Sequence, residues 1–270
     1  MSHFLEVRGL SKTYRRGGGV FADASEGERF TAVSHVSFTV EAGETFAIVG
    51  ESGCGKTTLA RLLLRLIEPD EGSIFFDGYD LRRASAEALR AFRHLMQMVF
   101  QDPFASLNPR MRVGELVGEP LGIHLPKLSQ AERQAQTAAI LERVGLSRDA
   151  MRRYPHEFSG GQRQRIGIAR ALILKPKLVV ADEPVSALDV SVGAQVLLLL
   201  QQLQRELGLT YILISHSLPV VAQMATHIAV MKAGHFAEIG PANKILEHPD
   251  SGYTKELLAA VPDIPRASRM

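Results

Sequence analysis

The sequence of 270 residues has very few cysteines, and Cys54 is the only one. A single cysteine excludes an intramolecular disulfide and a metal cluster held by several cysteines, which fits a reducing compartment. A charge excess is also missing, because 31 Lys and Arg residues stand against 29 Asp and Glu residues. Nucleic-acid-binding proteins usually carry a clear basic excess, so we do not expect a nucleic-acid partner.

Long hydrophobic runs are absent as well. The longest candidates, such as residues 196–200, fall far short of the ~18–20 apolar residues that a membrane-spanning helix needs. The N-terminal residues lack a positively charged segment followed by an apolar stretch, so we expect no secretory signal. If the protein serves a membrane process, we expect other chains to span the membrane.

The sequence does contain an alternation of buried-strand and amphipathic-helix patterns. Short continuous apolar runs predict buried strands at 46–49, 178–181, 211–214 and 228–231. Apolar residues at three- and four-residue spacing predict two helices, one over Leu59, Leu62, Leu63 and Leu66, the other over Val192, Val196, Leu199, Leu200 and Leu203. We expect the second helix to end near Gly208. This alternation predicts an α/β fold with a mostly parallel sheet.

Two regions depart from the alternation. Residues 4–8 and 33–40 alternate apolar and polar side chains and predict strands, whereas residues 17–28 look like a mobile insertion. Residues from about 85 to 163 are predicted to be mainly helical, with a capping box formed by Ser129 and Glu132. We therefore expect an inserted helical lobe.

A glycine-rich loop follows the first buried strand and precedes the first helix. It fits the pattern G-x-x-x-x-G-K-[ST] and consists of Gly50, Glu51, Ser52, Gly53, Cys54, Gly55, Lys56 and Thr57. Its glycines let backbone N–H groups point inward at an anion, and the helix N-terminus adds its positive end. Lys56 can reach the β- and γ-phosphates of ATP, and the Thr57 hydroxyl can ligate Mg²⁺. The strand–loop–helix context argues against a chance glycine-rich turn, and we interpret Cys54 as a small filler and not as a nucleophile.

Two carboxylates, Asp182 and Glu183, come directly after the predicted strand at 178–181. Ligands bind at the C-terminal ends of the strands of a parallel sheet. We therefore expect Asp182 near the metal ion and Glu183 beside it, where it can orient or polarise a water. Taken alone, the pair could be an ordinary acidic turn; together with the loop, it predicts ATP hydrolysis.

Residues 158–165 narrow the class of ATP-binding protein further. They read Phe-Ser-Gly-Gly-Gln-Arg-Gln-Arg. This segment resembles the signature sequence of ABC-transporter ATPase subunits, whose core is Ser-Gly-Gly-Gln. A serine and two glycines at a helix start can form a second anion site, although a plain helix-capping loop would read the same way. The resemblance implies that this site faces the γ-phosphate bound to the other subunit of a dimer, through Ser159, Gly160, Gly161 and Gln162.

Further matches to this family follow in its order along the chain. Tyr14 resembles the aromatic residue that stacks on adenine, with a purely structural tyrosine as the alternative. Gln101 resembles the glutamine that touches Mg²⁺ and the attacking water and links to the membrane subunit. Residues 186–189 resemble the loop that couples the two subunits' sites, and His216 resembles the histidine that contacts the γ-phosphate. The resemblance thus implies three residue sets: Glu183, His216, Lys56 and Gln101 for catalysis; Thr57, Gln101 and Asp182 for the metal; and Tyr14, residues 50–58 including Thr58, and residues 159–162 for the nucleotide.

The family resemblance also implies a domain organisation. It is that of a P-loop NTPase of the ABC ATPase type, with a RecA-like parallel-sheet core, an N-terminal antiparallel β region and an inserted α-helical subdomain. We expect a single ABC ATPase domain over residues 1–270. Its expected parts are a nucleotide-binding core (1–90 and 164–245), a helical insertion with the signature (91–163) and a C-terminal tail (246–270).

Four longer segments, 101–111, 153–162, 181–191 and 248–258, resemble ATPase subunits of the dipeptide/oligopeptide/nickel importer group, most closely its F-type subunit. This implies ATP and Mg²⁺ as ligands and a second ABC ATPase subunit, a D-type homologue in a heterodimer, as partner. It also implies two membrane permease subunits, an extracytoplasmic solute-binding protein and a peripheral location on the cytoplasmic face of the inner or plasma membrane. Two features depart from the group. Cys54 is the only cysteine of the sequence, so we expect no cysteine-rich tail with an iron–sulfur cluster, and Ser217 follows His216 where Asp is usual.

Two other functions remain open at this point. One is a non-transport ABC ATPase acting in DNA repair or on ribosomes, although such proteins usually carry coiled-coil or zinc insertions or two ATPase units. The other is a mainly regulatory subunit that binds ATP and turns it over slowly. Intact Glu183 and His216 argue against the second, unless an asymmetric partner spoils one of the two sites.

Overall fold

The computed structural model describes residues 3–15, 29–102 and 106–260. These residues form two compact units, one made of Met1–Ser85 and His216–Met270 and the other of Ala86–Ser215. The insertion expected at residues 17–28 lies outside the described residues. The boundaries of these two units differ from the boundaries that the sequence predicts for the nucleotide-binding core and the helical insertion. The division into core and insertion therefore stays a prediction.

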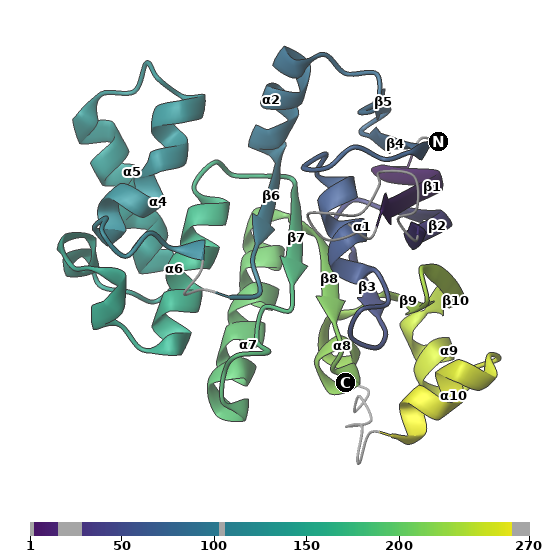
Figure 1. Ribbon diagram of the computed structural model, residues 1–270. Helices are drawn as coiled ribbons and strands as arrows, with labels where there is room; N and C mark the ends of the chain where they lie inside the picture. The colour runs from purple at the N-terminus through teal and green to yellow at the C-terminus, as the bar shows by residue number, and fades with distance from the viewer. Residues whose placement is uncertain (1–2, 16–28, 103–105, 261–270) are drawn as a thin grey trace, which may run out of the picture. The chain divides into compact units, whose positions relative to one another are not determined.

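The first unit contains a four-stranded antiparallel sheet in the order β2-β1-β4-β5 (Figure 1). Its long strands are β1 (Leu5–Arg15) and β2 (Arg29–Val40), and the short ones are β4 (Glu71–Phe76) and β5 (Tyr79–Asp80). Buried and exposed side chains alternate along much of β2, as expected for a sheet with one face toward the core. The expected strand at 33–40 is confirmed within β2, and the one at 4–8 is confirmed within β1 from Leu5 onward, because Phe4 precedes the strand.

The phosphate loop of the first unit begins at the end of β3 (Thr45–Val49), whose five residues are all buried. Strand β3 runs parallel to β9 (His227–Lys232), and β9 pairs antiparallel with β10 (His235–Pro241). The predicted strands at 46–49 and 228–231 are thereby confirmed. Neither β10 nor the turn that joins it to β9 was predicted.

Helix α1 (Lys56–Leu63) buries Leu59, Leu62 and Leu63 completely. The prediction that the helix extends to Leu66 is wrong, because Leu66 lies beyond its end and is 47% exposed. The chain leaves the helical conformation at Arg65, which has a positive φ of 49° and donates to the carbonyl of Leu81 and the carboxylate of Glu68. The contacts of Arg65 therefore end the helix about one turn earlier than the spacing of the apolar residues predicts.

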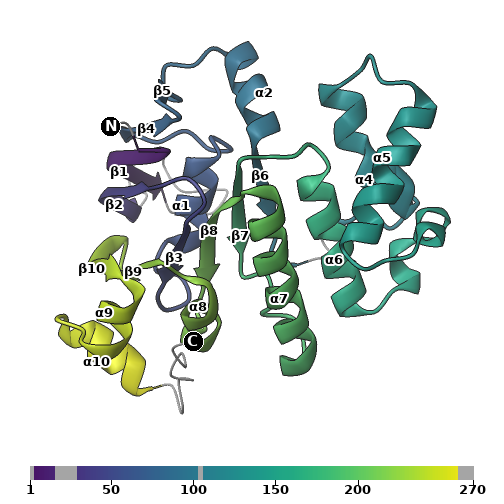
Figure 2. The same cartoon turned by 180° about the vertical axis from the view of Figure 1, so that it is seen from behind.

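Three helices complete the described part of the first unit. Helix α8 (Leu218–Met224) packs against β3, while α9 (Ala242–Glu247) and α10 (Gly252–Ala259) pack against β10. Figure 2 shows α9 and α10 beside the β9–β10 hairpin. The helical pattern of these short segments is too brief to read from sequence.

The second unit has its own parallel strands in the order β8-β7-β6. These are β6 (Met96–Val99), β7 (Leu178–Asp182) and β8 (Thr210–Ser215). Helix α7 (Val190–Leu207) joins this sheet through Tyr211, whose hydroxyl donates to the carbonyl of Leu200 over 3.2 Å. The helix ends at Gly208, which has a φ of 64°, so the predicted end is confirmed.

In the described part of the second unit, the other helices are α2 (Ala86–Leu95), α4 (Val113–His124), α5 (Gln130–Arg143) and α6 (Gly160–Leu172). Helices α4 and α5 lie side by side in both views (Figures 1 and 2). The expectation of helix from 85 to 163 is wrong at β6, where pairing with β7 makes a strand of a run of only four residues. Between α5 and α6 lie two 3₁₀ turns, η1 (Arg148–Arg152) and η2 (Pro155–Glu157).

The capping box predicted at the start of α5 is confirmed. The Glu132 N–H donates to the Ser129 hydroxyl over 3.3 Å, and the Ser129 N–H donates to the Glu132 carboxylate over 2.8 Å. The Ser129 hydroxyl also donates to the Glu132 carboxylate over 2.7 Å. This bond and the one from the Ser129 N–H hold the pKa of the Glu132 carboxyl below its usual value. Over the described ranges, none of the helices combines the length and the hydropathy that crossing a membrane requires.

Candidate active site

The phosphate loop joins β3 to α1 in the first unit, and two of its glycines, Gly50 and Gly55, occupy positions that leave no room for a side chain. A Cβ on Gly50 would lie 2.2 Å from the carbonyl oxygen of Met231, and one on Gly55 would lie 2.1 Å from that of Ala32. Both glycines have a positive φ, 155° and 112°. The loop is therefore pressed between the backbones of β2 and β9, which fixes its curled shape.

Lys56 is the first residue of α1 and is only 5% exposed. Its ammonium Nζ donates to the carbonyl oxygens of Gly50 over 2.7 Å and Glu51 over 2.8 Å. The loop thus curls over the ammonium and keeps it beside the backbone of residues 50 and 51. This is the position from which a lysine can reach phosphate oxygens bound by the loop.

Cys54 lies in the same loop and is 8% exposed. Burial raises the pKa of its thiol, and the nearby Lys56 opposes this effect more weakly. A buried thiol with a raised pKa stays protonated and is a poor nucleophile. These properties support the interpretation of Cys54 as a small filler.

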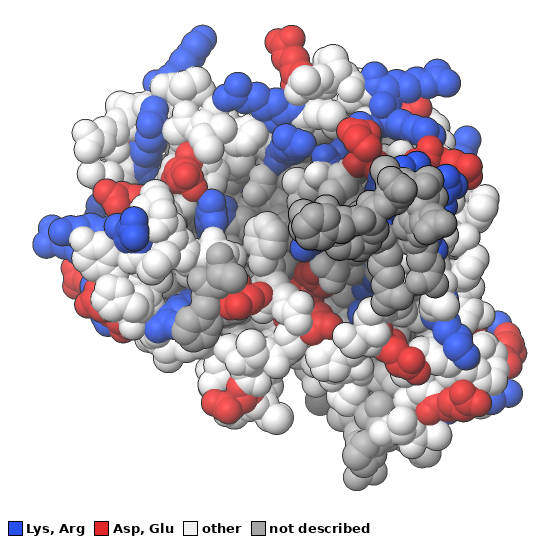
Figure 3. Space-filling model, in the orientation of Figure 1, with Lys and Arg blue, Asp and Glu red and all other residues white. Residues whose placement is uncertain are grey.

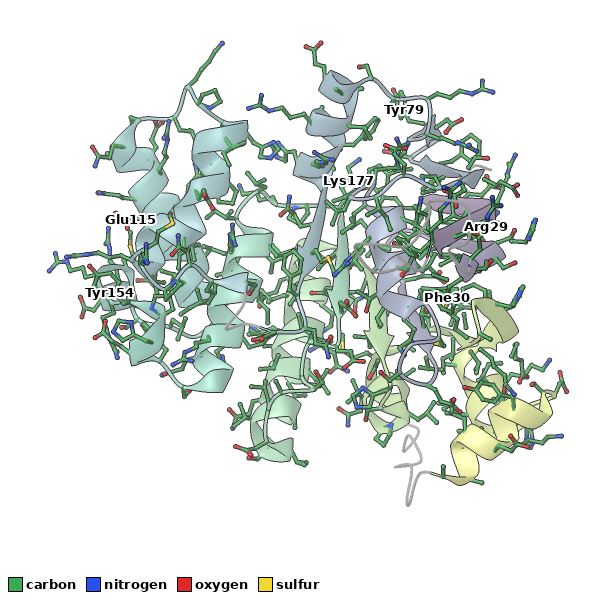
Figure 4. All side chains as sticks on the ribbon, in the orientation of Figure 1. Arg29, Phe30, Tyr79, Glu115, Tyr154 and Lys177 are labelled. Atoms are coloured by element: carbon green, nitrogen blue, oxygen red, sulfur yellow. The ribbon has the colours of Figure 1, made fainter. Side chains whose placement is uncertain are left out.

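Tyr14 lies on β1 directly opposite Phe30 on β2. Residues opposite each other in an antiparallel ladder carry their side chains on the same face. Both rings are accessible, with Tyr14 39% and Phe30 51% exposed. Figure 4 labels Phe30, which the sequence analysis missed because the apparent insertion concealed the start of β2.

Asp182 and Glu183 lie at the end of β7 in the second unit. Asp182 is the last residue of the strand and is 3% exposed, whereas Glu183 has a positive φ of 47°. Its N–H donates to the carbonyl of Ile214 over 2.9 Å, and its own carbonyl accepts from the Ser186 hydroxyl over 3.1 Å. A non-glycine residue in this conformation is strained, and these bonds hold it there.

The structure brings Gln101 to this pair of carboxylates. The side-chain amide Nε2 of Gln101 donates to the carboxylate Oε2 of Glu183 over 3.1 Å. The two residues are far apart in sequence, and Gln101 follows β6, the strand that pairs with β7. Adjacent parallel strands therefore place these two predicted catalytic residues together.

The signature residues begin helix α6, with Ser159 as its N-cap. The Ser159 N–H donates to the Gln162 side-chain oxygen over 3.0 Å, and the Gln162 N–H donates to the Ser159 hydroxyl over 3.4 Å. A Cβ on Gly161 would lie 2.3 Å from Cγ1 of Val192 in α7. The signature and the predicted coupling loop line one hollow of about 390 Å³, formed by Ser159, Gly160, Gly161, Ser186, Ala187, Leu188, Asp189 and Val192.

His216 directly follows β8 and is exposed. The next residue, Ser217, is the N-cap of α8, which belongs to the first unit. Serine and aspartate are both favoured at helix N-caps. Ser217 therefore occupies a helix N-cap position, which suits a serine as well as an aspartate.

The predicted site residues are thus divided between the two units. The first unit carries Tyr14, the phosphate loop and His216, and the second carries Gln101, the signature, Asp182 and Glu183. On the face shown in Figure 3, basic and acidic side chains are intermixed over α4 and α5 of the second unit. Figure 4 labels two residues from this part, Glu115 on α4 and Tyr154 before η2.

Three features together define a P-loop nucleoside triphosphatase. They are a phosphate loop with a buried lysine, a strand that ends in acidic residues, and a second helix that begins with glycines. The family profile described as "ABC transporter" matches residues 33–186, and the chain belongs to this family. The match includes the phosphate loop, Gln101, the signature and the Asp182–Glu183 pair. The protein is an ABC ATPase, which binds and hydrolyses ATP.

The sequence is similar to proteins that are named for peptide transport. It is 46% identical over 259 residues to an oligopeptide transport ATP-binding protein OppF of Streptococcus mutans, covering 96% of this chain and 82% of the relative. It is 47% identical over 264 residues to a di/tripeptide transport ATP-binding protein DppF of Pseudomonas aeruginosa, covering 98% and 80%.

Solved structures of ATP-binding cassettes resemble the chain in fold. One is a dimeric post-hydrolysis cassette bound to ADP and Pi, with a TM-score of 0.77 and 28% identity, covering 88% of this chain and 98% of the other. Another is cbiO1 from Clostridium perfringens, part of an ABC transporter complex, with a TM-score of 0.77 and 26% identity and 92% coverage of both chains. The fold class expected from the sequence is confirmed.

Proposed function

We propose that the protein is the ATP-hydrolysing subunit of an importer for dipeptides or oligopeptides, or for a related solute such as a nickel chelate. The observation that carries this proposal is the similarity to OppF and DppF proteins over nearly the whole chain. An intact set of catalytic residue types supports turnover over a purely regulatory role. The domain parts expected from sequence, a core, a helical insertion and a tail, belong to the proposal.

In the proposed mechanism, ATP lies between the phosphate loop of one subunit and residues 159–162 of its partner. The solved cassette dimer with ADP and Pi supports a dimeric arrangement. Lys56 and His216 would hold the γ-phosphate, and Tyr14 would stack on adenine. Glu183 would orient or polarise the attacking water, with Gln101 holding its carboxylate through the observed hydrogen bond. Catalysis then rests mainly on positioning and charge stabilisation.

Mg²⁺ suits the side-chain types of the three residues proposed to hold it. Thr57, Gln101 and Asp182 offer a hydroxyl, an amide and a carboxylate, which are the oxygen donors that Mg²⁺ prefers. Asp182 in particular is a carboxylate at a buried strand end, where a cation offsets the cost of burying its charge. The bound ion would neutralise charge on the β- and γ-phosphates.

The proposed assembly contains further chains. A second ABC ATPase subunit, a D-type homologue, would complete a heterodimer, and two permease subunits would span the membrane. An extracytoplasmic solute-binding protein would deliver the solute. The ATPase subunit would then lie peripherally on the cytoplasmic face of the inner or plasma membrane.

Reconstitution of the assembled complex tests the proposed function. In proteoliposomes with the permeases and the binding protein, dipeptides or oligopeptides should stimulate ATP turnover, whereas sugars and free metal ions should not. Failure of the chain to assemble with any permease pair would contradict a transport role. Turnover that no solute stimulates would instead favour the regulatory alternative.

Replacing Lys56 by Ala should lower the ATP affinity of the isolated chain at least about tenfold, because the main charged donor to the phosphates is removed. The matched control is Arg61→Ala, which removes an exposed cation from the same helix. Equilibrium titration with a fluorescent ATP analogue measures both variants. If the two bind ATP equally well, the role assigned to Lys56 is wrong.

A further inference from the structure

The first unit carries two exposed aromatic residues next to each other, Tyr14 on β1 and Phe30 on β2. They are directly opposite each other in the antiparallel ladder. Side chains at such positions lie on the same face of the sheet, with Cβ atoms about 4.5–5.5 Å apart. With Tyr14 39% and Phe30 51% exposed, much of both rings is accessible to a ligand.

Contacts of the neighbouring residues fix the position of these two rings. Thr13 is opposite Thr31, and their hydroxyl oxygens are 3.2 Å apart, which joins β1 and β2 on the other face of the sheet. The Thr13 N–H also donates to the carboxylate of Asp70 over 2.7 Å. The same carboxylate accepts from the ammonium of Lys12 over 2.7 Å, and this ammonium lies 5.8 Å from the centroid of the Tyr14 ring. The rings therefore lie on a strand pair that the protein itself holds in register.

Strand β2 also lines the phosphate loop. The carbonyl oxygen of Ala32 is the group that leaves no room for a Cβ at Gly55, the N-cap of α1. Phe30 precedes Ala32 by two residues, and a strand rises about 3.4 Å per residue, so Phe30 lies roughly 7 Å along β2 from this contact. That separation suits one molecule with its phosphates at the loop, its base at the two rings and its ribose between them.

Two adjacent rings suit a purine better than a pyrimidine. A purine base consists of two fused rings and a pyrimidine of one, so a single aromatic side chain can cover a pyrimidine but not a whole purine. Stacking on one aromatic ring tolerates any base, because every base has a π-face. A preference for purines therefore requires a second ring beside the first, and Phe30 provides it.

We propose that Phe30 is a specificity-determining residue of the nucleotide site, whose ring stacks together with that of Tyr14 against the two fused rings of a purine base. This inference deepens the proposed function and rests on the base-stacking role proposed for Tyr14. Tyr14 alone supports any base, and Phe30 adds the contact that only a purine is long enough to make. The protein then binds ATP and GTP more tightly than CTP.

The test compares Phe30→Ala with the unchanged full-length chain by calorimetric titration with ATP, GTP and CTP. The affinities for ATP and GTP should fall at least about fivefold, the lower end of what stacking of a base on an aromatic side chain contributes. The affinity for CTP should change less than about twofold, because one ring suffices for its base.

Two further variants serve as controls in the same titrations. Phe30→Tyr keeps an aromatic ring at the position and should retain the affinity for purine nucleotides. Tyr79→Ala removes an exposed ring from β5 in the same unit and should change none of the affinities (Figure 4). Thermal unfolding without nucleotide checks that each variant is folded.

Two results would overturn the inference. An ATP affinity of Phe30→Ala within about twofold of the unchanged chain shows that the ring does not contact the base, and equal losses for ATP and CTP reject its role in specificity. Tyr14→Ala measured in parallel keeps this inference apart from the proposed function. Normal ATP binding by Tyr14→Ala rejects the base-stacking role of Tyr14 itself, whereas weak binding by Tyr14→Ala with normal binding by Phe30→Ala rejects only the role of Phe30.

Discussion

Replacing Glu183 by Gln is expected to lower the kcat for ATP hydrolysis of the assembled complex at least about 100-fold, the usual effect of removing a general base. The amide has almost the shape of the carboxylate, and its oxygen can still accept from Nε2 of Gln101. The strained backbone at residue 183 is held by bonds of main-chain atoms, which the substitution leaves in place. The loss should therefore come from the missing negative charge and not from altered structure.

Steady-state ATPase assays and ATP binding measured on the same preparation separate these effects. Affinity for ATP should change less than threefold, because the phosphate loop and its lysine are untouched. Glu142→Gln, which neutralises an exposed carboxylate on α5, is the matched control and should retain full turnover. A Glu183→Gln complex that hydrolyses ATP at the normal rate would show that another group activates the water.

The local features of this site were predictable because their physical causes are local. The spacing of the glycines and Lys56 between a buried-strand run and a helical pattern encodes a phosphate loop, and the flanking apolar runs became β3 and α1 as expected. The capping box at Ser129 depends on two residues three positions apart, and it formed. Such signals need no knowledge of the rest of the chain.

The errors and omissions arose where distant residues decide the structure. Strand β6 exists because β7 lies beside it, and α1 ends early because Arg65 bonds to Leu81. The hydrogen bond between Gln101 and Glu183 also depends on that pairing of strands, so the sequence predicted the two residue types but not their contact. Phe30 could not be singled out, since only the β1–β2 register places it opposite Tyr14.

The second large effect is expected for Ser159→Ala, and Ser129→Ala is a closely matched control. Both serines are N-caps with a complete capping box, at the starts of α6 and α5 in the same unit. Loss of either cap should lower the free energy of unfolding by about 1 kcal/mol, which chemical denaturation measures. The stability cost of the two substitutions should thus be similar.

The two variants should differ in turnover, because only Ser159 is assigned to the nucleotide. Its hydroxyl would donate to the γ-phosphate held by the partner subunit, and loss of one hydrogen bond to a charged group should lower kcat roughly 10- to 100-fold. ATP binding by the isolated variant should be normal, since its own phosphate loop is intact. Ser129→Ala should keep full turnover at temperatures well below its Tm. Equal losses of turnover in both variants would trace the effect to helix stability and would reject the placement of ATP between two subunits.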